Sequence, residues 1–172
     1  MALTVTRETA RGRHYDYVLP NGTHISLDTY LGNNLVTLAT EGGGAPGAQD
    51  TSGLYPMAYL VRQSADSEIQ AHYHQADQFQ LFVHGTGRIG THALHGLTLH
   101  YAGALSPYGP IVSQSDGLQY LTFRNRWDPG DQCVRADRTL TTQGCGRKLG
   151  LVRQRFPEPY GVPWGCVSRA TS

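Results

Sequence analysis

Two histidines one residue apart, His72 and His74, are the residues whose types and spacing best suit chemistry. Side chains two residues apart in a β-strand point to the same face, so both imidazoles can reach one point. A neutral imidazole nitrogen is a ligand for zinc, iron, copper or nickel, and two of them leave coordination positions for a third ligand and a substrate. An HxH pair on a strand therefore suits a metal site, although many such pairs belong to ordinary strand faces.

Short strands rather than helices must position this pair. Alternating apolar residues at 15–19 and 23–27 flank the turn Pro20-Asn21-Gly22, which predicts an N-terminal hairpin. From Met57 to Arg124, short apolar runs recur between turn residues without a helical period. Closing such a sheet removes its exposed edges. We therefore predict an all-β barrel of eight or more strands.

The segment around the pair resembles the first motif of the cupin family. That motif has a glycine, five residues, HxH, three or four residues, a glutamate, six residues and a second glycine. His72, His74 and Gly85 match it, while Gln78 stands at the glutamate position and Asp66 at the first glycine position. The resemblance implies a single cupin-type double-stranded β-helix, or jelly-roll, barrel.

A second cupin motif has P-x-G, two residues, a histidine, three residues and an asparagine. Pro107-Tyr108-Gly109 supplies its middle, while Val112 and Asp116 stand at the histidine and asparagine positions. The gap between the motifs also suits the family. The resemblance covers the chain from Met57 to Arg124, and it implies a divalent metal ion (Zn, Fe, Ni, Cu or Mn) inside the barrel.

The departures at Gln78 and Val112 leave the implied metal site incomplete. Gln78 offers a neutral amide oxygen, so affinity should drop and a bound cation would be a stronger Lewis acid. His100 is the best substitute for the missing histidine, with its side chain facing either the pocket or the outer surface. The candidate ligands are thus His72, His74, Gln78 and His100. In the alternative interpretation, the pocket is metal-free and these side chains bind a ligand through hydrogen bonds.

Four more residues are candidates for substrate contact. Gln80 and Phe82 continue the period-two face of Gln78 and should line the same cavity. Tyr108 can act as a hydrogen-bond donor or acid, or cap the barrel as a packed side chain. Arg124 can hold a substrate carboxylate with a forked pair of hydrogen bonds, or pair with acidic neighbours at the surface. The remaining histidines are expected to face solvent: His14, His24, His84, His92 and His95.

Bulk properties exclude several functional classes. A net charge of +1 gives no strong field to attract nucleic acid. No apolar run approaches the roughly 20 residues that span a bilayer, so we expect a cytoplasmic protein without membrane contact. Three cysteines without a CxxC pair indicate reduced thiols. The sequence contains no GxSxG, HExxH or P-loop pattern.

We expect one domain in three parts. Residues 1–56 contain N-terminal strands, with one at 35–38, and the glycine-rich loop 41–48. Residues 57–126 form the barrel core, and 127–172 an irregular, arginine-rich tail that wraps the barrel or a partner. A homodimer is expected, through the hairpin or the tail.

The sequence leaves three functions open. The first is a metal-dependent cupin enzyme acting on a small oxygenated molecule, as a dioxygenase, isomerase or lyase. The second is a metal-free cupin that binds or senses a small molecule, and the third is a structural subunit with a vestigial pocket. One fold hosts many functions, so the resemblance names no substrate.

Overall fold

The computed structural model describes residues 2–32, 55–128 and 130–133. The predictions of a strand at 35–38, of a glycine-rich loop at 41–48 and of a wrapping tail beyond residue 133 therefore lie outside the described residues. Within the described ranges, no helix has the length and apolar character needed to cross a membrane.

The described chain consists of strands and one short helix. The N-terminal part contains α1 (Arg7–Arg11), β1 (His14–Val18) and β2 (His24–Leu31). The remaining strands are β3 (Met57–Gln63), β4 (Glu68–Ile69), β5 (His72–Tyr73), β6 (Gln78–Ile89), β7 (His92–His95), β8 (Thr98–Ala102), β9 (Ile111–Arg124) and β10 (Gln132–Cys133).

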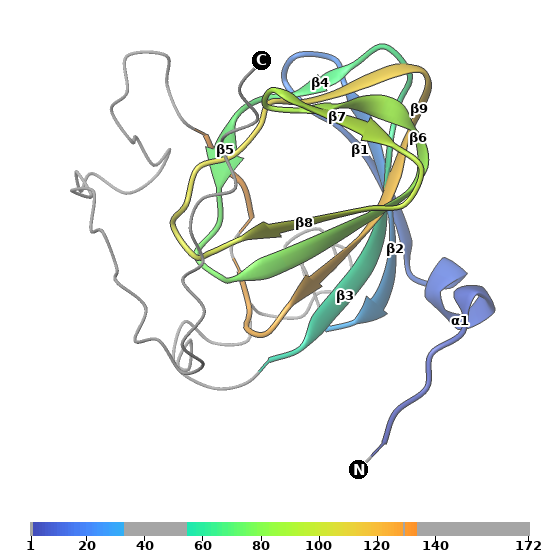
Figure 1. Cartoon of the computed structure of the whole chain (residues 1–172). Coiled ribbons are helices and arrows are strands. Elements are labelled where there is room, and N and C mark those ends of the chain that lie inside the picture. Colours follow the sequence, from blue (N-terminus) through green and yellow to red (C-terminus); the bar gives the residue numbers. More distant parts are fainter. Residues whose placement is uncertain (1, 33–54, 129, 134–172) are drawn as a thin grey trace.

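These strands form one large antiparallel sheet that curves into a barrel, with a smaller sheet beside it (Figure 1). The large sheet has the order β1-β2-β3-β9-β6-β7, with β4 paired to β9 and β8 paired to β6. The second sheet pairs β10 with β5, the strand that begins at His72. The prediction of an all-β barrel is confirmed.

The N-terminal hairpin is also confirmed. Strands β1 and β2 pair from His14↔Asp28 to Val18↔His24, and Gly22 lies in the turn with a φ of +87°. Strand β2 continues to Leu31 and pairs with β3. The hairpin is therefore an integral part of the large sheet. Helix α1 was not predicted; the Thr6 side chain caps its N-terminus by accepting a hydrogen bond from the Thr9 amide.

Each of the two longest strands joins two of the short apolar runs in the sequence: 79–84 and nearly all of 87–90 in β6, and 111–112 and 118–124 in β9. Strand β6 runs through Gly85 and Gly87, and its pairing with β9 shifts register on either side of Gly85. Such irregularities let a strand bend without ending. The glycines in β6 interrupt the apolar pattern, so it resembles two strands in the sequence. Strand β7 was not predicted, although its two histidines are exposed as expected.

The core lies between the inner faces of β2, β3, β6 and β9. Successive side chains along these strands point to opposite faces, and nearly all residues of β3 are buried. Phe82 and Tyr120 pack with their ring centroids 4.7 Å apart. The buried cluster consists of Ile25, Leu27, Met57, Tyr59, Val61, Ile69, Phe82, Ile89, Leu94, Ile111, Leu118 and Tyr120.

Gly85, the second glycine of the first motif, cannot be replaced without strain, because of its backbone conformation and the closeness of a neighbouring strand. Its φ is +88°, and a Cβ atom there would lie 1.9 Å from the carbonyl oxygen of Gly117. Asp66, at the first glycine position of that motif, also has a positive φ of +47°. Aspartate tolerates the left-handed region better than most residues. The departure at Asp66 therefore preserves the turn.

A substitution pair separates the two constraints on Gly85. We expect Gly85→Ala to lower the free energy of unfolding by about 3 kcal/mol, because strain at positive φ and a backbone clash add together. Gly22→Ala is the matched control, since Gly22 has nearly the same φ and a Cβ atom there would meet nothing within 4 Å. It should cost about 1 kcal/mol. Urea denaturation measures both, and equal losses would mean that the contact with Gly117 carries no weight.

The outer face of β8, β6 and β9 carries exposed apolar side chains. Phe79 lies opposite both Tyr101 and Phe123, and Leu81 lies opposite Leu99 in the next row. Phe79, Leu99, Tyr101 and Phe123 are each at least two-fifths exposed. A contiguous apolar surface of this kind is unusual on a soluble monomer. The expected homodimer itself stays a prediction.

Candidate metal and ligand site

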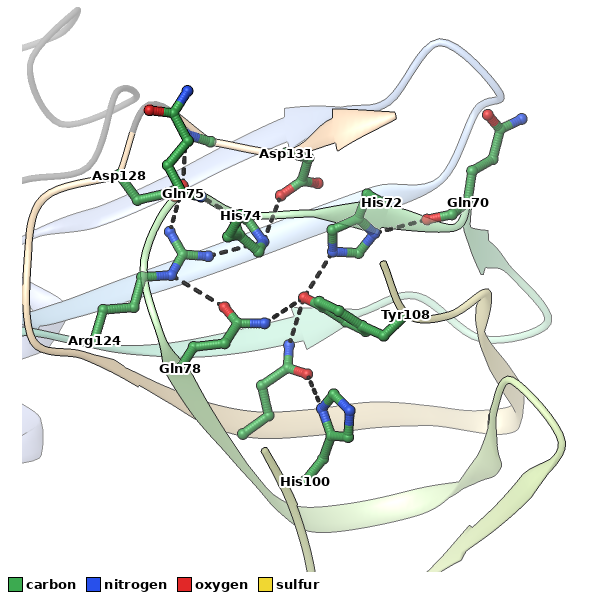
Figure 2. A network of polar contacts seen from close by, with 12 residues as sticks. Gln70, His72, His74, Gln75, Gln78, His100, Tyr108, Arg124, Asp128 and Asp131 are labelled. Carbon is green, nitrogen blue, oxygen red and sulfur yellow. Dashed lines mark hydrogen bonds and ion pairs between the residues drawn. The ribbon is translucent and has the colours of Figure 1, made fainter. Parts of the chain in front are cut away.

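A cavity of about 290 Å³ opens within the barrel and contains the histidine pair. Its apolar and aromatic lining includes Leu19, Ile25 and Leu27 from the N-terminal hairpin and Tyr59 and Tyr120 from β3 and β9. The polar lining residues, most of them drawn in Figure 2, are His72, His74, Gln80, Tyr108, Thr122, Arg124, Asp128 and Asp131.

His72 presents its Nε2 atom to the cavity. Its Nδ1 atom lies 2.7 Å from the carbonyl oxygen of Gln70, which can only accept, so Nδ1 carries the proton. Nε2 is therefore the acceptor, and it lies 2.7 Å from the hydroxyl of Tyr108. A backbone acceptor that fixes the tautomer in this way is typical of histidines that bind metals.

His74 is fixed in the same tautomer by a carboxylate. Its Nδ1 atom lies 2.8 Å from Asp128 Oδ1, and its Nε2 atom lies 3.0 Å from Arg124 Nη2, which can only donate. Burial, opposed by Asp128 but assisted by the positive charge of Arg124, lowers the pKa of His74 below its ordinary value. His74 is therefore neutral at pH 7, the state in which an imidazole can bind a metal.

Asp131 adds a carboxylate to the histidine pair. Its Oδ1 atom lies 3.3 Å from His74 Nε2, and its side chain is 42% exposed. One ligand atom each from His72, His74 and Asp131 lies within 4.8 Å of the others. Burial opposes the ionisation of Asp131, but the nearby histidines and Arg124 hold the pKa of its carboxyl below the usual value. It is therefore an anion at pH 7.

Arg124 lies inside the site rather than at the surface, since its side chain is buried. It donates to Gln78 Oε1 from Nε over 3.1 Å and to Asp128 Oδ1 from Nη1 over 3.0 Å, besides its contact with His74 (Figure 2). The guanidinium also lies 5.5 Å from the centre of the Tyr59 ring, a cation–π distance. Arg124 thus pairs with an acidic neighbour, as the alternative interpretation expected, but this pair is buried and not at the surface.

Asp128 is the carboxylate that connects these groups. Its side chain is buried, and its two oxygens accept from His74, Arg124 and the backbone amides of Gln75 and Gly130. Burial alone would raise the pKa of Asp128, but the hydrogen bond from His74 and the charge of Arg124 lower it. The carboxylate is thus ionised and fully partnered.

The Tyr108 hydroxyl lies where three polar side chains converge. It donates to His72 and accepts from Gln78 Nε2 over 2.5 Å, with Gln80 Nε2 at 3.5 Å. Two backbone hydrogen bonds between His72 and Tyr108 hold the P-x-G segment against the start of β5. Burial raises the pKa of Tyr108 well above its ordinary value, so the phenol stays protonated.

The residues that line the cavity do not include His100, or Phe82, which was predicted to line it. His100 Nδ1 lies 2.9 Å from Gln80 Oε1, and burial, together with the neighbouring histidines His72 and His92, lowers the pKa of His100 to about 4. Phe82 lies in the apolar core. Val112 pairs with Glu68 and Arg88 on the strand ladder and offers no ligand atom.

The structure thus brings His72, His74, Gln78, Gln80, Tyr108 and Arg124 into one polar network. The Gln78 oxygen accepts from Arg124, and its amide nitrogen donates to Tyr108. Gln78 and His100 as metal ligands stay predictions. Sequence reasoning missed Asp128 and Asp131, because W-D-P-G-D has the composition of a turn.

The donor set fits a divalent metal. Two imidazoles and a carboxylate form the ligand set of non-haem iron oxygenases, and of zinc sites with an open position. Both histidines have outer partners that leave Nε2 free of a proton. Each Nε2 atom nevertheless accepts one hydrogen bond, from Tyr108 or from Arg124. A cation bound by both imidazoles therefore requires these two donors to turn aside.

The large antiparallel sheet curved into a barrel indicates the cupin fold, and comparison with solved structures confirms this assignment. A polyketide cyclase, RemF, from Streptomyces resistomycificus has a TM-score of 0.52 at 11% identity, over 78% of this chain and 87% of that one. An RmlC-like cupin protein from Ralstonia eutropha JMP134 has a TM-score of 0.52 at 10% identity, over 83% and 78%.

A candidate acetylacetone dioxygenase from Methylibium petroleiphilum PM1 is similar to the same extent. Its TM-score is 0.51 at 10% identity, over 83% of this chain and 88% of that one. No family model and no curated protein matches the sequence. The chain therefore has the cupin fold, and the proteins of this fold that resemble it include enzymes.

Proposed function

We propose that this chain is a cupin-fold enzyme that binds a divalent metal ion through His72, His74 and Asp131 and acts on a small oxygenated molecule. One observation carries the proposal. The outer nitrogens of both histidines donate to fixed acceptors, so that both inner nitrogens approach one ionised carboxylate. Nothing in an ordinary strand face requires that arrangement.

The cavity favours a small substrate that has both apolar and oxygenated groups. Its volume is near the lower end of the ~300–1,000 Å³ typical of ligand pockets, which favours a small molecule. Apolar and aromatic side chains line the cavity together with the charged residues Arg124, Asp128 and Asp131. An oxygen atom among these polar groups would meet Arg124 as a hydrogen-bond donor. The Tyr108 hydroxyl could donate to it as well when a bound metal replaces Tyr108 at His72 Nε2.

The side chains around the site would orient the substrate and hold protons. Tyr108 keeps its proton on the phenol oxygen, because burial raises its pKa, so it serves as a donor. Asp128 holds the tautomer of His74 through Nδ1. A divalent ion at this site would supply Lewis-acid polarisation of a bound oxygen atom. Isomerase, lyase and dioxygenase reactions on such a substrate all fit this arrangement.

Replacing Asp131 by asparagine tests the proposed metal site. We expect Asp131→Asn to weaken Zn²⁺ or Fe²⁺ binding by about tenfold or more, because the site loses its negative charge while keeping its shape. Isothermal titration of untagged, metal-free protein measures the affinity. The matched control is Asp116→Asn, since Asp116 is an exposed aspartate on β9 that hydrogen-bonds Thr86.

The control should bind like the unchanged protein. If the unchanged protein binds none of zinc, iron, nickel or copper, the proposal of a metal-dependent enzyme is wrong. If Asp131→Asn binds metal as tightly as the control, Asp131 is not a ligand.

A second candidate function is a metal-free cupin that binds a small molecule. The observation in its favour is that Tyr108 and Arg124 already donate to the two inner nitrogens, which completes a hydrogen-bonded network. Absence of metal in the purified protein, together with no binding on titration, would favour this function.

A further inference from the structure

Arg124 occupies the direction from which a metal would reach His74. Its Nη2 atom lies 3.0 Å from His74 Nε2, and that contact uses the only lone pair that the ring can offer. A divalent ion at Nε2 would compete with the Arg124 guanidinium, a second cation, for the same acceptor. At separations of a few ångströms inside a protein their mutual repulsion is large.

The remaining contacts of Arg124 hold it in this position. Nη1 bonds to Asp128 and Nε bonds to Gln78 Oε1, the oxygen at the position of the glutamate in the first motif. The side chain is only 8% exposed, so water does little to screen its charge. All three nitrogens of the guanidinium thus contact side chains of the site, and its positive charge lies where a metal cation would bind.

We infer that Arg124 is a positioning residue that competes with the metal at His74, so that metal binds only when the guanidinium turns away from Nε2. This inference rests on the proposed function and deepens it. The competition makes metal affinity adjustable, because anything that draws the guanidinium elsewhere, such as a substrate carboxylate, frees the nitrogen. An incoming anion and the metal would therefore bind cooperatively.

Removing the guanidinium tests the competition directly. We expect Arg124→Met to bind Zn²⁺ at least about tenfold more tightly than the unchanged protein, because a hydrogen bond and a charge repulsion both disappear. Asp128 keeps its bonds to His74, Gln75 and Gly130 in this variant, so the histidine stays oriented. Competition with a chromophoric chelator measures the affinity without reference to activity.

The control is Arg88→Met, since Arg88 is exposed and donates to the carbonyl of Gly90, which is not among the residues that line the cavity. It should leave zinc affinity unchanged. Tighter binding by Arg124→Met alone supports the inference. Equal or weaker binding by Arg124→Met overturns it while leaving the proposed metal site intact. No binding by any of the three proteins overturns the inference and the proposed function together.

An NMR experiment on the unchanged protein tests the same inference in case Arg124→Met does not fold. The Nε–H group of Arg124 is buried and hydrogen-bonded to Gln78, so its NMR signal should exchange slowly with water. Arg124→Gln identifies that signal by its absence; Arg124→Lys serves if this variant does not fold. On adding Zn²⁺ we expect the signal to shift and its protection to fall by about tenfold, because the guanidinium must move. Zinc bound with an unchanged Nε–H signal would contradict the competition.

Discussion

The double variant His72→Ala, His74→Ala is expected to lose all stoichiometric metal. Both proposed nitrogen ligands disappear at once, and a single half-exposed carboxylate is too weak a ligand to hold a divalent ion. We expect about one metal per chain in the unchanged protein after reconstitution and less than about a tenth of that in the variant. Elemental analysis of untagged protein measures both values.

A second pair of histidines provides the matched control for this experiment. His92 and His95 are both exposed on β7, and neither belongs to the candidate site. The variant His92→Ala, His95→Ala should therefore retain its metal. If metal is lost from the control and kept by the double variant at positions 72 and 74, the site lies elsewhere in the chain.

Asp128→Ala is expected to destabilise the protein by about 3–5 kcal/mol, the usual cost of leaving a buried charge without its partner. Arg124, His74 Nδ1 and the backbone amides of Gln75 and Gly130 would all lose an acceptor. The midpoint of urea denaturation should fall accordingly. Asp116→Ala is the control, because its exposed carboxylate accepts from Thr86, and we expect a loss below about 1 kcal/mol.

The pH dependence of stability follows from the same carboxylate. The folded state holds the pKa of Asp128 below its unfolded value, so the stabilisation is present above about pH 4 and is lost as pH falls through the folded pKa. The unchanged protein should lose stability in that range, and Asp128→Ala should lose less. A parallel acid dependence in both proteins would assign the effect to other groups.

Two histidines, His74 and His100, are expected to reduce stability at a higher pH than Asp128 does. Burial lowers the pKa of His100 to about 4, so protons bind the unfolded state more readily than the folded state below about pH 6.5. The sign is the same for His74, whose pKa is also lowered. Stability should therefore decline as pH falls from about 6.5, before the decline due to Asp128 begins.

The barrel could be predicted because its requirements are local. The turn at Asn21-Gly22 and the period-two pattern around it define the hairpin. The first motif has a glycine at a fixed sequence spacing after the histidine pair, and the backbone at Gly85 needs a glycine. Such requirements depend on residues close together in the sequence. The same patterns could not show that β6 and β9 are continuous, since bulges and glycines interrupt the alternation without ending a strand.

The candidate site could be predicted only in part. His72 and His74 share a strand face, so their convergence follows from spacing alone. Asp128 and Asp131 reach them from a distant part of the chain, between the end of β9 and the pairing of β10 with β5. A turn-like sequence gives no indication of such a contact. Likewise, the orientation of the Gln78 amide depends on Arg124 and Tyr108, which no local pattern connects.

The pairing between β10 and β5 is short and lies next to the candidate site. Only two residue pairs join these strands, and Asp131 lies immediately before them. A cation held by Asp131 and the two histidines would act as a clasp between segments that are otherwise joined by few backbone bonds. By mass action, such a ligand shifts the equilibrium toward the closed form. A cation that binds only when β10 is paired with β5 would therefore favour that pairing, so that metal binding and the pairing would be coupled.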